Sequence, residues 1–227
     1  PMQEKDRPYL LTLSSHTDGM DRFLDSLKKA GDLEHIVVQF KPYTKGLRSL
    51  VKIDLEYPGH FNKWLYVPDG LDPDRYVVFS DTSDVIFQKP LPKFTHDLYL
   101  APESVDHRDT MWKDHIDQFP ALAPLMDKEV LNCGTFAMKA KHLYEYRDFI
   151  FSFDKKGYGS WPHHLEQICF NMFVYSRHDL SKVIDRSIFC PLFANIYHGV
   201  KKTDGIWKDG KKIISCVHAN GSLKELL

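Results

Sequence analysis

Two aspartates, Asp81 and Asp84, form the pattern in this sequence that most clearly suggests chemistry. The hydrophobic run that begins at Val77 stops at these two carboxylates, three residues apart, and then resumes to Phe87. In an open parallel sheet, ligands bind at the carboxyl ends of strands. Two carboxylates there need a cation or hydrogen bonds to offset their repulsion, and hard oxygen ligands suit Mg²⁺ or Mn²⁺. Asp-Thr-Ser-Asp is equally typical of a plain turn, so the pair alone leaves both interpretations open.

A second candidate lies near the end of the sequence, where His218 leaves a predicted strand. Its imidazole is a possible metal ligand, although a histidine in such a place is more often structural. Asn220, the flexible backbone of Gly221 and the ammonium group of Lys224 follow within a few residues. Backbone and ammonium donors of this kind suit phosphate oxygens. The pattern therefore indicates a phosphate-binding segment beside a possible metal ligand.

Two more segments carry polar groups at predicted element ends. Asn132 and Gly134 introduce a strand, and the glycine would let a ligand approach the backbone closely. Glu166 and Gln167 occupy the first turns of a helix predicted to begin near Pro162. The Glu166 carboxylate could orient a hydroxyl group or stabilise developing positive charge. It could equally be an acid that interacts with the helix dipole.

The hydrophobic pattern predicts the elements that would position these residues. A strand over 9–15, a helix with Met20, Phe23, Leu24 and Leu27 on one face and a strand over 35–40 form a β-α-β unit. Further strands are predicted over 76–79, 97–100, 133–138 and 212–217, helices over 61–67, from 143 to 150 and from about 162 to 173, and a loop-like segment over 102–118. This order predicts one α/β domain over 1–227, with a mostly parallel central sheet flanked by helices.

Composition narrows the functional classes. The 227 residues are 43% hydrophobic and 13% aromatic, which indicates a sizeable core. With 30 basic and 31 acidic residues, the balance speaks against binding nucleic acid by bulk charge. No apolar run approaches the roughly 18 residues of a membrane-spanning helix, and the first residues are polar. We therefore expect a cytoplasmic location with no membrane contact, and the four widely spaced cysteines to be reduced and mostly buried.

The order and spacing of these motifs resemble the GT-A glycosyltransferases, which have the nucleotide-diphospho-sugar transferase fold. Within that fold, the chain is similar to the glycosyltransferase domain of procollagen lysyl hydroxylases and to collagen-type galactosyltransferases. Their Phe-x-Asp-x-x-Asp-Val-Ile motif is matched from Phe79 to Ile86, and their late His-x-Asn-Gly-x-x-Lys motif from His218 to Lys224. The resemblance runs from the strand at Leu10 to Lys224, over nearly the whole chain.

The resemblance implies a role for each candidate residue. Asp81, Asp84 and His218 would ligate Mn²⁺ or Mg²⁺, and Glu166 would be the catalytic carboxylate near the sugar. The nucleotide-sugar site would be formed by Leu13, Ser14, Ser15, Lys63, Ser83, Asn132, Gly134, Gln167, Asn220, Gly221 and Lys224. Among these, Leu13 to Ser15 would line the nucleoside pocket, and Asn220 to Lys224 would hold the diphosphate of a UDP-sugar.

The sequence departs from the family at two positions. Ser83 stands where the family has an aromatic residue that packs on uracil, and Leu165 replaces the first acid of the family's Asp-Asp-Gln helix. The motifs therefore imply the metal site and the diphosphate site more directly than the identity of the base.

These features predict a metal-dependent glycosyltransferase that moves a hexose from a UDP-sugar to a hydroxyl-bearing acceptor. The acceptor's class stays open among protein, glycan and modified base. One alternative is a sugar nucleotidyltransferase, although the loop over 14–19 has one glycine and neither lysine nor arginine. Another is a non-catalytic module that binds a nucleotide-sugar, with the Asp81 turn purely structural.

Overall fold

A six-stranded sheet lies at the centre of the computed structural model, which describes residues 7–14, 20–39, 63–110, 113–114, 117, 120–152, 165–219 and 221–227. In spatial order its strands are β2 (Glu34–Gln39), β1 (Tyr9–Ser14), β3 (Tyr76–Ser80), β6 (Glu129–Lys139), β5 (Leu98–Asp106) and β7 (Lys182–Ile184). β1 is parallel to β2 and β3, and β5 is parallel to β7, whereas β6 is antiparallel to both of its neighbours. The prediction of a mostly parallel sheet in an α/β fold is confirmed.

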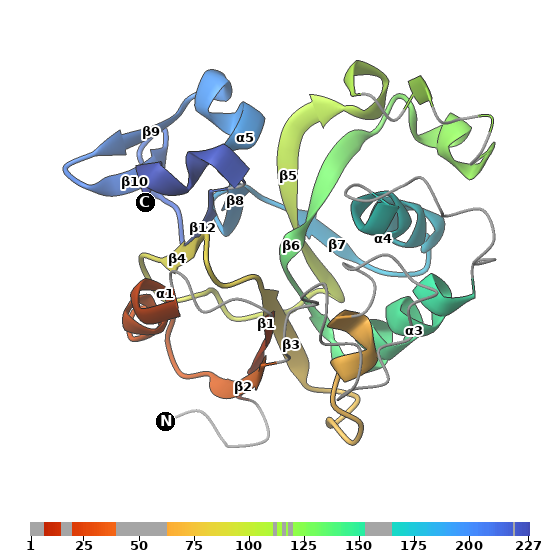
Figure 1. The fold of residues 1–227 in the computed structure, drawn as a ribbon, viewed down its shortest axis with the longest axis horizontal. Helices are drawn as coiled ribbons and strands as arrows, with labels where there is room; N and C mark the ends of the chain where they lie inside the picture. Colours follow the sequence, from red (N-terminus) through yellow and green to blue (C-terminus); the bar gives the residue numbers. More distant parts are fainter. Residues whose placement is uncertain are drawn as a thin grey trace, which may run out of the picture.

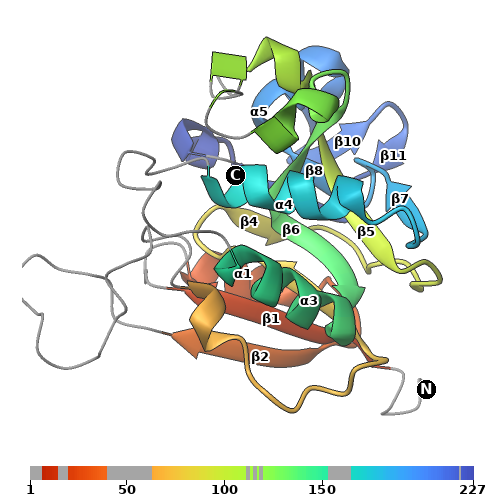
Figure 2. The same ribbon diagram turned by 90° about the vertical axis from the view of Figure 1, so that its right-hand side faces the viewer.

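Helices cover both faces of this sheet (Figure 1). Helix α1 (Met20–Leu27) packs on one face, and α3 (Ala140–Phe151) and α4 (Leu165–Ser176) lie together on the other, which faces the viewer in Figure 2. Because successive side chains of a strand point to opposite faces, Val78 joins the apolar cluster of α1, whereas Val77 and Phe79 join that of α3 and α4. β3 is thus apolar on both faces.

Two small sheets complete the fold beside the α1 face. One has the order β4 (Val85–Phe87), β12 (Cys216–His218) and β8 (Phe189–Pro191), and the other consists of β9 (Val200–Thr203), β10 (Ile206–Asp209) and β11 (Lys212–Ile213). A third apolar cluster, which includes Trp207, Ile214 and Val217, joins them. The remaining short segments are α5 (Leu192–Asn195), η2 (Lys63–Tyr66), η3 (His107–Asp109), η5 (Pro120–Leu125), η7 (Ile196–His198) and η8 (Gly221–Leu226).

Several predicted boundaries are wrong for identifiable reasons. The segment after residue 101 is not wholly loop-like, because β5 continues to Asp106 by pairing with β6 across register shifts, with Ser104 at a φ of 54°. The closing strand predicted over 212–217 is two strands, since the chain leaves β11 at Ile214 and enters a different sheet. The helix predicted over 61–67 is a single 3₁₀ turn within the described residues, at Lys63–Tyr66.

Two expectations about composition are also tested. All four cysteines are free and buried, as predicted. In the described part of the chain, no helix combines the length and the apolar character that a bilayer crossing requires.

The buried face of α1 differs from the predicted one at Leu24, and this difference can be tested. Leu27 is buried with 4% of its surface exposed, but Leu24 is 43% exposed. We expect Leu27→Ala to lower the free energy of unfolding by about 2–5 kcal/mol, the usual range for a buried leucine. Leu24→Ala should change it by no more than about 0.5 kcal/mol, as surface substitutions do. Urea unfolding of both variants measures the difference, and equal losses would contradict this orientation of α1.

Candidate functional site

The turn that carries Asp81 and Asp84 connects the end of β3 to the start of β4. The Asp81 backbone N–H donates to the Gly134 carbonyl oxygen at 2.8 Å, which ties the turn to β6. Two cations from distant segments hold Ser83: the Arg22 guanidinium donates to its carbonyl oxygen at 2.9 Å, and the Lys224 ammonium to its hydroxyl at 3.2 Å. The turn is therefore held by β6, by α1 and by η8 near the end of the chain.

His218 reaches the same place because β12 pairs antiparallel with β4. The register sets His218 opposite Val85, and the Ala219 N–H donates to the Asp84 carbonyl oxygen at 2.7 Å. The imidazole Nε2 then lies 3.5 Å from Asp84 Oδ2 and 3.9 Å from Asp81 Oδ2. The structure thus brings together the three side chains for which the sequence predicts metal ligation.

The electrostatics of this cluster stabilise its charges. Burial opposes the charged imidazole of His218, but its hydrogen bond with Asp84 and the charges of Asp84 and Asp81 outweigh burial and raise its pKa. Burial also opposes the charged form of Asp84, and the hydrogen bond and charge of His218, together with the charge of Lys224, lower the pKa of that carboxyl. Without another cation, His218 and Asp84 therefore form a buried ion pair.

Gly134 leaves the space into which these side chains fit. A Cβ atom at this position would lie 2.3 Å from His218 Cε1 and 2.6 Å from Asp81 Oδ2. Both distances are far shorter than a van der Waals contact. The sequence predicts that the glycine admits a ligand, whereas in the structure the groups that approach its backbone are the site's own side chains.

A buried amide and carboxylate network lies behind the imidazole. Asn132 Oδ1 contacts His218 Nδ1 at 3.0 Å, and Asn132 Nδ2 donates to Glu103 Oε1 at 2.8 Å. Gln167 Nε2 donates to the same Glu103 oxygen at 2.8 Å. Burial raises the pKa of Glu103, against the hydrogen bonds from both amides.

Glu103 is the residue of this network that the motifs miss. It lies in β5, toward the carboxyl end of a strand parallel to β3. The rule that places ligands at the carboxyl ends of parallel strands would have found it, had the strand been predicted beyond Leu100.

Lys63 connects Asp81 with Glu166 on the other side of the turn. Its Nζ lies 3.4 Å from Asp81 Oδ1 and 2.9 Å from Glu166 Oε1, and Trp64 Nε1 donates to that Glu166 oxygen at 2.7 Å. Burial disfavours the Lys63 ammonium, but the charges of Asp81 and Glu166 outweigh it and raise the pKa. Burial raises the pKa of Glu166, against the charge of Lys63. Glu166 is only 5% exposed and already engaged by two donors.

The other predicted site residues fall outside this cluster or outside the described residues. Leu13 packs in the same apolar cluster as Trp64. Ser14 ends β1 and Gly221 begins η8, both without a described side chain. Ser15 and Asn220 lie outside the described residues, so the predicted nucleoside pocket and part of the predicted diphosphate site stay predictions.

The donor set suits a hard divalent cation, although the donors are not closed around one. No group of three or more His, Cys, Asp or Glu side chains among the described residues is arranged so that it could hold a metal ion as it stands. Ligands of a small octahedral ion lie about 3 Å apart, whereas His218 Nε2 lies 3.5 Å from Asp84 Oδ2 and 3.9 Å from Asp81 Oδ2. The two carboxylates are the hard oxygen ligands that suit Mn²⁺ or Mg²⁺, whereas an imidazole also suits Zn²⁺.

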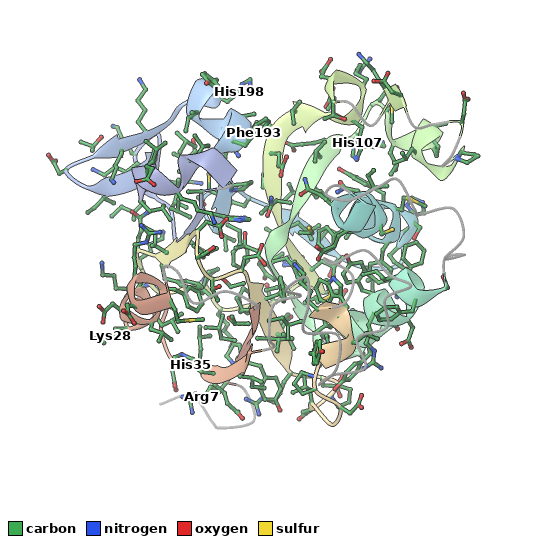
Figure 3. The ribbon with its side chains drawn as sticks, viewed as in Figure 1. Arg7, Lys28, His35, His107, Phe193 and His198 are labelled. Carbon is green, nitrogen blue, oxygen red and sulfur yellow. The ribbon has the colours of Figure 1, made fainter. Side chains whose placement is uncertain are left out.

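The sequence contains 12 histidines, but those in the described part of the chain form no further group of possible metal ligands. His35, His107 and His198 lie at three separate places on the molecule (Figure 3). His107 is wholly buried, and its Nδ1 contacts the Lys128 carbonyl oxygen at 2.6 Å. His35 and His198 are exposed, so of these three only His107 is part of the buried scaffold, and His218 is the one that reaches Asp81 and Asp84.

Gly134→Ala tests the close approach. The added methyl group should displace His218 or Asp81 and lower the free energy of unfolding by about 1–3 kcal/mol, as overpacking does. Gly210→Ala is the control, because Gly210 has a φ of 58° and no atom within 4 Å of an added Cβ. It should show only the backbone penalty of about 1 kcal/mol, with unchanged chemical shifts for the His218 ring. Unchanged His218 shifts in Gly134→Ala would contradict this packing.

Comparison with known proteins identifies the fold. No protein-family model matches the sequence, and no curated protein matches it. The chain is similar to a glycosyltransferase involved in glycosylation of the major capsid of PBCV-1, with a TM-score of 0.55 and 14% identity over 96% of each chain. It is similar to the glycosyltransferase GlyE of Streptococcus pneumoniae, with a TM-score of 0.55 and 14% identity over 97% of this chain and 59% of GlyE.

A weaker likeness, at a TM-score of 0.47 and 12% identity, is to the galactosyltransferase LgtC over 94% of this chain and 77% of LgtC. The narrower resemblance to procollagen lysyl hydroxylases and collagen-type galactosyltransferases is not shown and stays a prediction. At this level of identity the two stronger likenesses bear on the fold, which is that of the GT-A glycosyltransferases.

Proposed function

We propose that the protein is a glycosyltransferase that uses Mn²⁺ or Mg²⁺ to move a hexose from a UDP-sugar to a hydroxyl-bearing acceptor. The observation that carries the proposal is that Asp81, Asp84 and His218 come together at the carboxyl end of β3, in a GT-A fold. The fold supports glycosyl transfer in general. The donor, the metal and the class of acceptor are proposed from the motifs and the chemistry of the site.

In the proposed reaction, the three donor side chains would hold a cation that binds the nucleotide. A divalent cation, when bound, supplies positive charge that stabilises the departing diphosphate. Of the three donor side chains, Asp81 is the most accessible, with 32% of its side chain exposed, compared with 14% for Asp84 and 6% for His218. Asp81 therefore lies at the open side of the cluster, and the other two donors are more deeply buried.

Lys224 is the chain's own cation beside the proposed diphosphate. Its ammonium lies 3.2 Å from the Ser83 hydroxyl, within the turn that joins the two aspartates. A lysine on a flexible stem can turn from a neutral hydroxyl to a phosphate oxygen, where the charge makes the hydrogen bond stronger. We assign it to binding the leaving group.

Glu166 is the proposed catalytic carboxylate, held in place before any substrate binds. Lys63 and Trp64 both donate to Glu166 Oε1, which fixes the orientation of the side chain. A carboxylate so placed can stabilise positive charge that develops on the sugar ring. Because Lys63 also contacts Asp81, the ammonium links this carboxylate to the proposed metal ligand.

Asp84→Asn and His218→Ala test the metal assignment. Asp84→Asn replaces a charged ligand with a neutral amide oxygen, and His218→Ala removes the imidazole, so we expect the Mn²⁺-dependent affinity for UDP in calorimetry to fall at least 10-fold, with Mn²⁺-independent binding little changed. Asp179→Asn is the matched control, because Asp179 is an exposed carboxylate paired with Arg177 away from the site. UDP affinity that did not depend on Mn²⁺ in the wild type would overturn the proposal and favour a structural turn.

A double-variant cycle separates the role of Glu166 from that of Lys63. If the Glu166 carboxylate acts directly on the sugar, Glu166→Gln should lower kcat of UDP-sugar hydrolysis at least 100-fold with little change in KM. The loss should persist when Lys63→Met is already present. If Glu166 only holds Lys63, the double variant should be no slower than Lys63→Met alone.

Release of pyrophosphate from a nucleoside triphosphate and a sugar phosphate would instead identify a nucleotidyltransferase.

A further inference from the structure

The hydrogen bonds of one buried amide determine which nitrogen of His218 faces the aspartates. Asn132 is 2% exposed, and its Oδ1 accepts a hydrogen bond from the Gly134 backbone N–H at 2.8 Å. A backbone N–H can only donate, so the oxygen of this amide, not its nitrogen, must face Gly134. The carboxylate Glu103 Oε1, at 2.8 Å from Asn132 Nδ2, requires the same orientation from the other end of the amide.

The same oxygen is the atom that contacts the imidazole. Asn132 Oδ1 lies 3.0 Å from His218 Nδ1. Since an amide oxygen only accepts, Nδ1 must carry the proton, whether the ring is neutral or charged. In the neutral ring the lone pair then belongs to Nε2, the nitrogen that lies 3.5 Å from Asp84 Oδ2. The backbone of β6 thus selects the tautomer of a histidine that is 86 residues away in sequence.

We infer that Asn132, held by Glu103 and the Gly134 N–H, is a positioning residue that fixes neutral His218 as the Nδ1–H tautomer, so that Nε2 is the nitrogen with a lone pair for a cation. The inference rests on the proposed metal site and adds a role to Asn132, which the motifs assign to the nucleotide-sugar. Metal-binding histidines generally donate their second N–H to a protein acceptor, and the loss of that acceptor weakens metal binding about 10- to 100-fold. The acceptor here is the Asn132 amide oxygen, and the Asn132 amide nitrogen donates a hydrogen bond to the buried Glu103 carboxylate.

The test reads the tautomer directly in the metal-free protein. Nitrogen NMR of ring-labelled histidine, recorded above the pH at which His218 loses its charge, distinguishes a protonated from an unprotonated ring nitrogen. The His218 signals are those missing from a His218→Gln sample. We expect a protonated Nδ1 and an unprotonated Nε2 in the wild type, and the opposite tautomer in the wild type would overturn the inference.

Variants assign the effect to Asn132. Asn132→Leu keeps the volume and removes the acceptor, so it should lose the Nδ1–H preference and weaken Mn²⁺ binding about 10- to 100-fold in calorimetry. Gln167→Leu is the control, because it removes the other amide that donates to Glu103 and leaves the Asn132 contact intact. It should keep the wild-type tautomer. An unchanged tautomer in Asn132→Leu would overturn the inference.

Two further measurements distinguish a failure of this inference from a failure of the proposed function. Asn132→Asp retains an acceptor oxygen for the imidazole N–H and should keep the tautomer, so this variant and the wild type decide the question if Asn132→Leu does not fold. If the wild type bound no Mn²⁺, the proposed function would fail. The NMR result on the metal-free protein would still decide whether Asn132 sets the tautomer.

Discussion

The site depends on the close approach of the β6 backbone to the Asp81 turn, which only a residue without a side chain allows. The Gly134 carbonyl oxygen accepts a hydrogen bond from the Asp81 N–H, and a Cβ atom at Gly134 would lie 2.3 Å from Cε1 of the His218 ring. Because β6 is the antiparallel strand between β3 and β5, it also carries Asn132 to a position between His218 and Glu103. One strand therefore positions the turn, the imidazole and the buried carboxylate together.

The charges around this strand explain why the site is polar and yet stably buried. Buried charges are tolerated when they are paired and hydrogen-bonded. Glu166 is paired with Lys63, Asp84 with His218, and Glu103 accepts from two amides. Asp81 is shared by Lys63 and His218 and is the most exposed of these acids, with 32% of its side chain in contact with solvent. Asp81 is therefore the acid of this network that a further cation could reach most easily.

The sequence predicts most of the central sheet because burial on both faces leaves a clear pattern. Val77, Val78 and Phe79 are all wholly buried, so β3 is a continuous apolar run that ends at Asp81. The late motif around His218 is likewise visible in sequence. Glu103 is not, because β5 is bent by register shifts and contains Pro102, which interrupt the strand pattern. The link between Lys63 and Glu166 joins segments about a hundred residues apart, and no local periodicity records such a contact.

The hydrogen bonds of Arg22 and Lys224 to Ser83 have a consequence for the order in which the molecule folds. Lys224 reaches Ser83 across 141 positions of the chain, and β12 must join β4 before His218 can meet Asp84. Contacts of such high sequence separation form late, because closing long loops costs entropy before any contact repays it. During synthesis the β1-α1-β2 unit and β3 can assemble while the aspartates still lack their partners. A chain that has emerged only as far as β11 therefore has its main sheet but not the contacts of His218 and Lys224, so cation binding at the proposed site would report completion of folding.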